Sequence, residues 1–129
     1  MIRGVGTDIV EIARLRQSIE RYADAFLAHV FTPDEQSSAP HSGDARLAYF
    51  AGRWAAKEAV AKALGTGFCE KCAWLELRIT NLPSGAPVVE LSGTAAVTAA
   101  ERGIHTIHLS ISHEKHYAVA VAIAEDLKP

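Results

Sequence analysis

The hydrophobic period of the chain changes near residue 12, and this change separates a predicted strand from a predicted helix. In residues 2–11 alternate positions share one face, which holds Ile2, Gly4, Gly6, Asp8 and Val10. From residue 12 the apolar side chains follow the helical period, as Ile12, Leu15, Ile19 and Tyr22. Arg14 and Arg21 fall together on the opposite side. We therefore expect a strand followed directly by an amphipathic helix with a basic outer face.

The middle of the chain is predicted to form a short helix, a polar loop and one long helix. Thr32, Pro33 and Glu35 have the pattern of a helix start with a capping box. Residues 37–44 form a polar loop whose last residue, Asp44, suits an N-cap. A helix is then expected from about 45 to 64, with Gly65 as its left-handed end.

The second half of the chain is predicted to be mostly antiparallel strands. Residues 74–80 and 87–91 alternate around a hairpin-type loop, and residues 105–112 and 117–124 alternate around the turn 113–116. Between these pairs, residues 92–103 form a small helix that Ser92 caps. The last strand carries only alanine on one face, which suits close packing of a helix or of a neighbouring chain. Helices beside antiparallel strands predict an α+β fold, with residues 1–129 forming one domain.

Composition is typical of a globular protein and points to no charged polymer or membrane as partner. Hydrophobic residues make up 49% and charged residues 22% of the 129, and the formal net charge is −2. Because the net charge is small, we expect no binding to nucleic acid or membrane. We also expect a cytoplasmic protein, because the N-terminus lacks the layout of a signal peptide.

Cys69 and Cys72 lack the second pair that a zinc site needs and do not open a helix, so two reduced thiols are expected.

Glu58 is the residue of the long helix that does not fit its surroundings. The apolar stripe of that helix is formed by Leu47, Phe50, Ala51, Trp54 and Ala61. Glu58 projects near the middle of this stripe, whereas Arg53 and Lys57 are assigned to the polar side. An unpartnered carboxylate on an apolar surface costs several kcal/mol or becomes protonated. An ion pair with Lys62, one turn later, and a bound cation are the two alternatives.

Asp8 presents the same question on the first strand. Capping of the following helix is one role for it. It also shares a face with Ile2 and Val10, and the two preceding glycines allow other groups to approach the backbone. Two carboxylates suit Mg²⁺, which completes its octahedron with waters and substrate phosphates, and Lys62 would then meet phosphate charge. Backbone N–H groups at Gly65 either bind a phosphate or simply end the helix.

Three segments together resemble one family of enzymes. They are "GVGTDIVEIARL" at 4–15, "FAGRWAAKEAVAKALGTG" at 50–67 and "LSISHEKHYAVAVAIAE" at 109–125. In order and spacing the chain is similar to bacterial holo-acyl-carrier-protein synthases, the small 4′-phosphopantetheinyl transferases of fatty acid synthesis. The resemblance implies an antiparallel sheet packed against a long central helix, and homotrimers with active sites at subunit boundaries. It also implies transfer of phosphopantetheine from coenzyme A to a serine of apo-acyl carrier protein, which releases adenosine 3′,5′-bisphosphate.

The resemblance assigns roles to individual residues. It implies that Asp8 and Glu58 hold Mg²⁺ and that Lys62 faces the diphosphate, with Glu58 and Lys62 as the catalytic pair. The remaining coenzyme A contacts that it implies are Arg53, Gly65, Gly85, Pro87 and His113. Ala86 stands where the family often has a lysine. The group that removes the serine proton is left open between Glu58 and a metal-bound water.

The partner implied by the resemblance is strongly acidic, which suits the basic face of the first helix. Arg14 and Arg21 are thus candidates for docking acyl carrier protein, although arginines also serve simply to keep a surface soluble. Three other functions are compatible with parts of the pattern. They are a broader-specificity phosphopantetheinyl transferase, normally about twice this length, a non-catalytic binding module, and a Mg²⁺-dependent phosphohydrolase.

Overall fold

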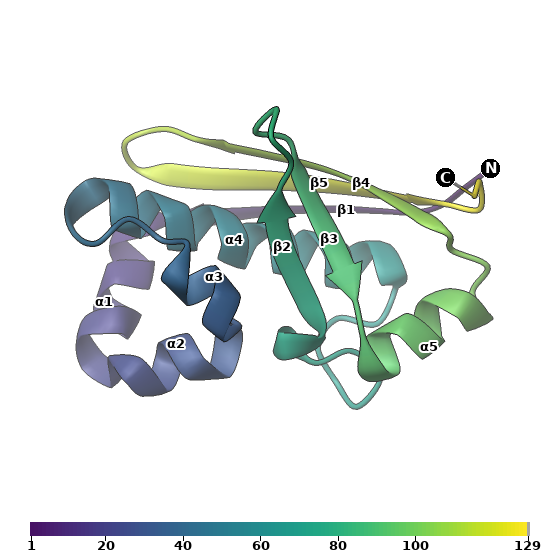
Figure 1. Cartoon of the computed structure of the whole chain (residues 1–129), viewed down its shortest axis with the longest axis horizontal. Coiled ribbons are helices and arrows are strands. Elements are labelled where there is room, and N and C mark those ends of the chain that lie inside the picture. The colour runs from purple at the N-terminus through teal and green to yellow at the C-terminus, as the bar shows by residue number, and fades with distance from the viewer. Residues whose placement is uncertain (129) are drawn as a thin grey trace.

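The structure is a computed structural model and describes residues 1–128. Its elements follow one another along the chain in an order that mixes helices and strands (Figure 1). They are β1 (Ile2–Glu11), α1 (Ile12–Tyr22), α2 (Asp24–Val30), α3 (Pro33–Ser37), α4 (Gly43–Leu64), the 3-10 helix η1 (Trp74–Glu76), β2 (Leu77–Asn81), β3 (Pro87–Leu91), α5 (Gly93–Glu101), β4 (Thr106–His113) and β5 (Tyr117–Glu125).

The strands form two antiparallel sheets, and α4 lies between them. The larger sheet has the order β1-β5-β4, and the smaller one is the hairpin β2-β3. In Figure 1 the hairpin crosses in front of α4 while the three-stranded sheet runs along its other side. Helices α1 and α2 lie at one end and α5 at the other. The predicted α+β class, with a long helix packed on an antiparallel sheet, is confirmed.

Small residues allow α4 to pack unusually close to the large sheet. A Cβ atom added at Gly4 would overlap the carbonyl oxygen of Ala63, and one at Gly6 would overlap that of Ala59. On β5 the alanine face points the same way, and all four of its residues are buried, namely Ala118, Ala120, Ala122 and Ala124. The expected close approach at the glycines of β1 is therefore confirmed, and a helix is what covers the alanine face.

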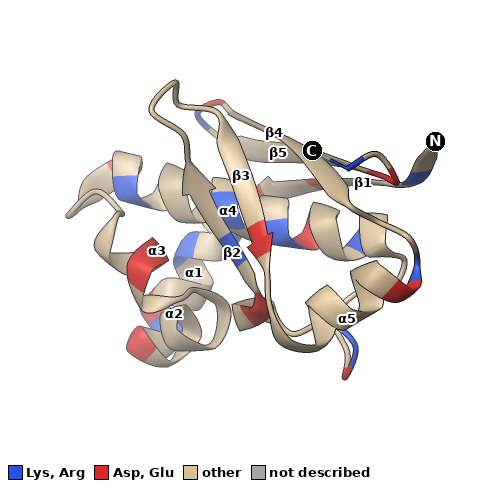
Figure 2. Ribbon diagram, turned by 45° about the vertical axis from the view of Figure 1, so that its right-hand side comes forward, with Lys and Arg blue, Asp and Glu red and all other residues tan. Residues whose placement is uncertain are grey.

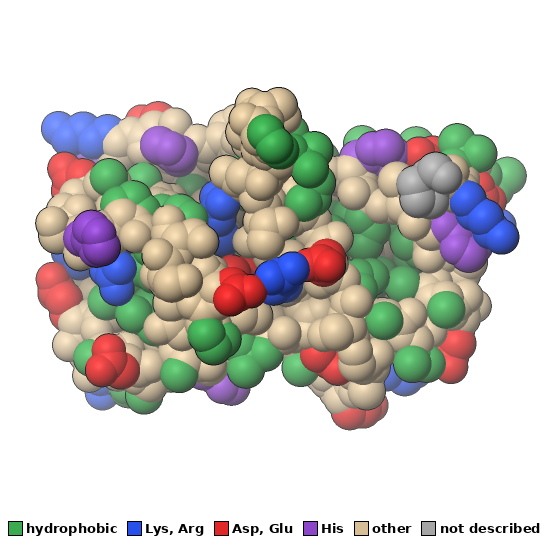
Figure 3. Space-filling view, viewed as in Figure 1, with side chains coloured by type: hydrophobic (Ala, Val, Ile, Leu, Met, Phe, Trp, Pro, Cys, Tyr) green, Lys and Arg blue, Asp and Glu red, His purple; other side chains and the backbone are tan. Residues whose placement is uncertain are grey.

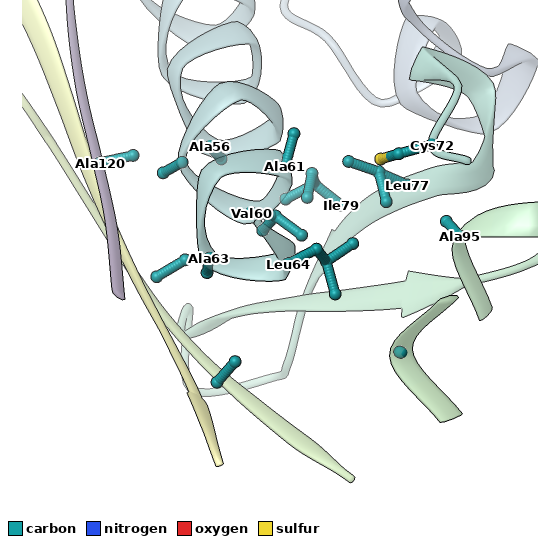
Figure 4. Packing of buried hydrophobic residues seen from close by; sticks show 14 of the residues in the cluster. Ala56, Val60, Ala61, Ala63, Leu64, Cys72, Leu77, Ile79, Ala95 and Ala120 are labelled. Carbon is teal, nitrogen blue, oxygen red and sulfur yellow. The ribbon is translucent and has the colours of Figure 1, made fainter. Parts of the chain in front are cut away.

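The core on the opposite side of α4 is built from larger side chains. Val60, Ala61 and Leu64 of α4 face Leu77 and Ile79 of β2 (Figure 4). A second apolar cluster, around Phe31 and Phe50, joins the first half of α4 to α1 and α2. As a result α4 is buried on nearly all sides in its second half, and few of its positions there remain for polar groups.

This burial corrects the predicted polar side of α4. Lys57 was expected to face solvent, but its side chain is fully buried. Its ammonium group pairs with Glu35, with Nζ 2.7 Å from Oε1. The polar side assigned to Lys57 was therefore wrong, because its partner lies 22 residues away in the sequence and is not seen in a helical projection.

Several helix boundaries also differ from the predicted ones. Helix α4 begins at Gly43 after Ser42, so Asp44 lies inside the first turn instead of capping it. The Ser92 side chain makes no capping hydrogen bond, and Glu76 accepts from the N–H of Thr94 instead. The pattern did not predict α2, which follows a turn at Ala23 with φ 47°.

Candidate active site

The first candidate group lies where β1 passes the second half of α4. The Lys62 Nζ atom is 3.1 Å from Asp8 Oδ1 and 2.9 Å from the carbonyl oxygen of Thr7. Lys62 is half-exposed, whereas the Asp8 carboxyl is 14% exposed. The other Asp8 oxygen, Oδ2, is buried and has no hydrogen-bond partner among the described residues. A buried carboxylate oxygen without a donor is costly, so a ligand is expected to satisfy it.

Glu58 belongs to the same group. Burial raises the pKa of the Glu58 carboxyl, and the nearby Asp8 carboxylate raises it further, while Lys62 opposes both effects. The two carboxylates are thus close enough to repel each other. Like charges held together in a partly desolvated place are an unfavourable arrangement unless a cation binds between them. In Figure 2 acidic and basic positions follow one another along this part of α4.

A pocket of about 250 Å³ opens beside Asp8 and extends along α1. Its walls include Asp8, Arg14 and Ser18, together with the aromatic rings of Phe26 and Trp54. Arg14 and Asp8 therefore line the same hollow, while Arg21 is exposed at the end of α1, next to Tyr22. The structure places one of the two docking candidates at the site and the other further along the same helix.

A second group forms around Arg53, also on α4. Its guanidinium donates to the Asn81 side chain at 2.7 Å and lies 4.3 Å from the centre of the Tyr49 ring. The Nε of Arg53 is buried without a partner among the described residues. Arg53 and His113 line one pocket of about 250 Å³. Two of the residues predicted for the nucleotide end are therefore brought together.

The other predicted coenzyme A contacts have plain structural roles. Gly65 ends α4 in the left-handed conformation, and its N–H donates to the carbonyl oxygen of Lys62. The N–H groups of Thr66 and Gly67 both donate to Ala61, so these three N–H groups serve the helix end rather than face outward. Gly85 lies exposed in the β2–β3 loop, and Pro87 pairs with Asn81 at the base of that loop. Nucleotide binding by these residues stays a prediction.

The two groups lie on different sides of α4. Arg53 precedes Glu58 by five residues, which corresponds to a rise of about 7.5 Å and a turn of about 140° around the helix. Within one chain the carboxylates and Lys62 therefore do not face Arg53 and His113.

The carboxylate group fits Mg²⁺ by its donor chemistry. In residues 1–128 no cluster of three or more His, Cys, Asp or Glu side chains is arranged to hold a metal. Mg²⁺ does not require such a cluster, because it usually takes one or two carboxylates and completes its shell with waters and substrate phosphates. Asp8 has a buried oxygen without a donor, and Glu58 supplies the second carboxylate. These two residues would hold the ion.

The sequence and the fold of the chain are both similar to those of one family of transferases. A sequence model described as the 4′-phosphopantetheinyl transferase superfamily matches residues 4–122. The chain belongs to this family. The family predicted from the three sequence segments is thereby confirmed.

Individual relatives resemble the chain over nearly its full length. A holo-[acyl-carrier-protein] synthase of Desulforudis audaxviator is 50% identical over 96% of this chain and 93% of its own. The crystal structure of the Neisseria meningitidis holo-[acyl-carrier-protein] synthase has a TM-score of 0.89 at 34% identity, covering 97% and 99% of the two chains. That of the Bacillus anthracis enzyme, in complex with CoA (3′,5′-ADP), has a TM-score of 0.84 at 34% identity, covering 98% and 99%.

The sequence pattern missed some residues that shape the site. Trp54 and Phe26 line the pocket beside Asp8, and Asn81 accepts a hydrogen bond from Arg53. Trp54 was assigned only to the apolar stripe and Asn81 only to a loop, and Phe26 was given no role. Their roles depend on contacts between distant parts of the chain, which the spacing of hydrophobic residues does not reveal.

Among residues 1–128 no helix is long and apolar enough to cross a membrane.

Proposed function

We propose that this chain is a Mg²⁺-dependent holo-acyl-carrier-protein synthase, acting as one domain in the cytoplasm. It transfers the 4′-phosphopantetheine group of coenzyme A to a serine of apo-acyl carrier protein and releases adenosine 3′,5′-bisphosphate. One observation supports the Mg²⁺ dependence of this reaction. Asp8 lies beside a second carboxylate and a lysine, and its Oδ2 is buried without a donor among the described residues. Family membership supports the reaction.

The residues of the first group would divide the chemistry between them. When bound, Mg²⁺ would neutralise charge on the coenzyme A diphosphate and orient it for attack. Asp8 and Glu58 would hold the ion, and their mutual repulsion would be relieved by it. Lys62 is half-exposed and already held beside Asp8, so it would offset charge on the phosphate that leaves. The pocket beside Asp8, which Arg14 also lines, would give the incoming serine a route to the site.

A second copy of the chain would complete the site. Arg53 and His113 are the predicted partners of the nucleotide end, but they lie on another side of α4 from Glu58. We therefore propose a homotrimer whose sites are shared between neighbours. The outer face of the large sheet supports this proposal, because large apolar side chains are exposed there in adjacent strands (Val5, Ile9, Tyr117 and Val119).

Acyl carrier protein would dock on α1. Arg14 and Arg21 are both on the exposed side of that helix, and an acidic partner would be attracted to them. Charge reversal of both to Glu is expected to raise the KM for the carrier protein by at least about tenfold, since like charges across an interface are repulsive. The KM for coenzyme A should not change. Equal changes in both KM values would contradict the docking role.

One assay tests the reaction against its alternatives. The protein is incubated with apo-acyl carrier protein, coenzyme A and Mg²⁺, and the carrier protein is weighed by mass spectrometry. A mass increase of one phosphopantetheine group is expected, with none when EDTA replaces Mg²⁺. Free phosphate without modification would indicate a phosphohydrolase. No change under either condition would indicate a binding module.

Mixing two inactive variants tests whether sites are shared. Glu58→Gln removes a metal ligand and Arg53→Ala removes a nucleotide contact, so each homotrimer is expected to be inactive. If each site takes Glu58 from one chain and Arg53 from its neighbour, refolded mixtures contain some intact sites and regain part of the activity. Mixtures that stay inactive, while wild-type chains refolded alongside recover, would contradict a shared site.

A further inference from the structure

Cys69 and Cys72 are brought directly opposite each other by the backbone. The N–H of each residue donates to the carbonyl oxygen of the other, and both distances are 3.0 Å. Residues paired in this reciprocal way have Cα atoms about 5.5 Å apart and point their side chains to the same side of the ribbon. Disulfides span Cα distances of about 4.4–6.8 Å. The tight turn through Glu70 and Lys71 therefore holds the backbone of two free cysteines at a spacing that a disulfide accepts.

The two thiols differ sharply in their surroundings. Cys69 is exposed, and its sulfur accepts the N–H of Lys71 at 3.4 Å. Cys72 is fully buried and its side chain points into the core beside Leu77 (Figure 4). Burial raises the pKa of the Cys72 thiol to about 11, an effect that Thr66 partly offsets. Because the thiolate is the reactive form, Cys72 stays unreactive toward reagents in solution while Cys69 is accessible to them.

We propose that Cys69 and Cys72 form a reversible disulfide by exchange with a low-molecular-weight disulfide, with Cys69 as the residue that reacts first. In the first step the Cys69 thiolate attacks one sulfur of the small disulfide and releases one small thiolate, leaving a mixed disulfide at Cys69. In the second step the Cys72 sulfur, having lost its proton to solvent, attacks the Cys69 sulfur and releases the second small thiol. The two protein thiols are oxidised and one small disulfide is reduced to two thiols.

The position of the pair in the fold decides what this bond would restrain. Residues 65–73 connect the end of α4 to η1, and Phe68 in this segment stacks on Trp74 with ring centres 3.7 Å apart. Oxidation would draw the Cys72 sulfur from the core toward the turn. The second step is therefore expected to be slow, and the mixed disulfide should be detectable before the bridge closes. Asp8 and Glu58 lie outside this segment, so the disulfide can be tested without reference to catalysis.

The experiment follows the mass of the full-length reduced protein in glutathione buffers of increasing oxidised fraction at mildly alkaline pH. Samples are quenched with acid, free thiols are alkylated, and intact masses are measured. The expected course is a transient species heavier by one glutathione, then a product lighter by two hydrogen atoms that takes up no alkylating agent. Peptide mapping should place the bond between residues 69 and 72, and dithiothreitol should reverse it.

Two variants separate the steps. Cys72→Ala should stop at the mixed disulfide, and Cys69→Ser should not react over the same time. The proposal is overturned if the wild-type protein stays as a mixed disulfide, forms dimers linked by Cys69, or does not react in buffers that oxidise dithiothreitol. It is likewise overturned if oxidation begins only after a chelator is added, which would show that the pair holds a metal. The decisive readings come from the wild-type protein, so a variant that fails to fold does not obscure them.

Discussion

Helix α4 presents two lysine–carboxylate groups in neighbouring positions, and they differ in how completely their atoms are satisfied. The first is Lys57 with Glu35, both fully buried. The second is Glu58 with Asp8 and Lys62, where Lys62 is half-exposed. Lys57 and Glu58 are consecutive residues of the same helix, yet the backbone turns their side chains into different environments. The comparison separates a pair that holds the fold together from a group that is open to a ligand.

The buried pair is saturated with hydrogen bonds. Lys57 donates to the Val30 carbonyl at 2.6 Å, to Glu35 at 2.7 Å and to the Trp74 carbonyl at 3.2 Å, which uses all three of its protons. Glu35 also accepts the N–H groups of Thr32 and Ile79, each at 2.7 Å. The pair thus ties the start of α3, β2 and η1 to α4.

The open group is not saturated. Asp8 Oδ2 has no donor among the described residues, and burial together with Asp8 raises the pKa of Glu58. A surface network offers a third case, since Arg78 pairs with both Asp34 and Glu90. A basic side chain between two acidic ones is visible over β2 and β3 in Figure 3. Exposed pairs of this kind contribute little to the free energy of unfolding. Large effects of substitution are therefore expected only for the first two groups.

The largest expected effect concerns the buried pair. Lys57→Met leaves the Glu35 carboxylate buried without its cation, and we expect the free energy of unfolding to fall by about 3–5 kcal/mol. Urea denaturation followed by circular dichroism measures the change. The double variant Glu35→Gln with Lys57→Met removes both charges and should recover part of the loss. A loss below about 1 kcal/mol in the single variant would contradict a saturated buried pair, since that is the range of exposed pairs.

The next effect concerns the carboxylates of the open group. Asp8→Asn and Glu58→Gln should each lower kcat/KM for phosphopantetheine transfer by at least about a hundredfold, or about 2.7 kcal/mol of transition-state stabilisation. The physical reason is loss of a charged oxygen ligand for Mg²⁺. Mass spectrometry of the carrier protein gives the rate. Near-normal turnover in either variant would refute its assignment as a ligand.

A matched substitution on the same helix sharpens the comparison. Lys62→Met makes the same chemical change as Lys57→Met, but at a half-exposed position. It should lower kcat by about tenfold, or about 1.4 kcal/mol, because charge on the leaving phosphate is no longer offset. The free energy of unfolding should change by less than about 1 kcal/mol, because the Lys62 pair is exposed. If Lys62→Met proved as destabilising as Lys57→Met, the distinction between the two groups would fail.

Hydrophobic period and local motifs predicted the elements better than the partners of their side chains. The end of α4 at Gly65, the capping box of Thr32 with Glu35 and the close approach at Gly4 and Gly6 are confirmed, because each depends on neighbours in sequence or on the alternation of one strand. The structure also brings Asp8, Glu58 and Lys62 together, as expected, while their binding roles stay predictions.

The environment of Lys57 could not be predicted in this way. Its three acceptors belong to Val30, Glu35 and Trp74, which lie between 17 and 27 residues away along the chain. Helical projection reports which side of α4 a residue occupies but not what covers that side. Because α2, α3 and η1 supply the groups around its ammonium, a position assigned to solvent became part of the core.

The smallest expected effect is a gain in stability, whereas most substitutions destabilise a protein. Because the folded-state pKa of Glu58 is raised, its contribution to stability is present at low pH and is lost as the pH rises through that pKa. At neutral pH without metal, Glu58→Gln should therefore be more stable than the wild-type protein, by less than about 1 kcal/mol since the site is partly exposed. Urea denaturation in EDTA should show this gain in the free energy of unfolding shrinking as the pH falls.

Added Mg²⁺ should stabilise the wild-type protein and leave Glu58→Gln largely unaffected, because only the wild-type protein has both carboxylates for the ion. A difference that does not vary with pH, or a wild-type protein more stable than the variant in EDTA at neutral pH, would mean that burial and the nearby Asp8 do not raise the pKa of Glu58. The Glu58 carboxylate would then be as well satisfied as that of Glu35.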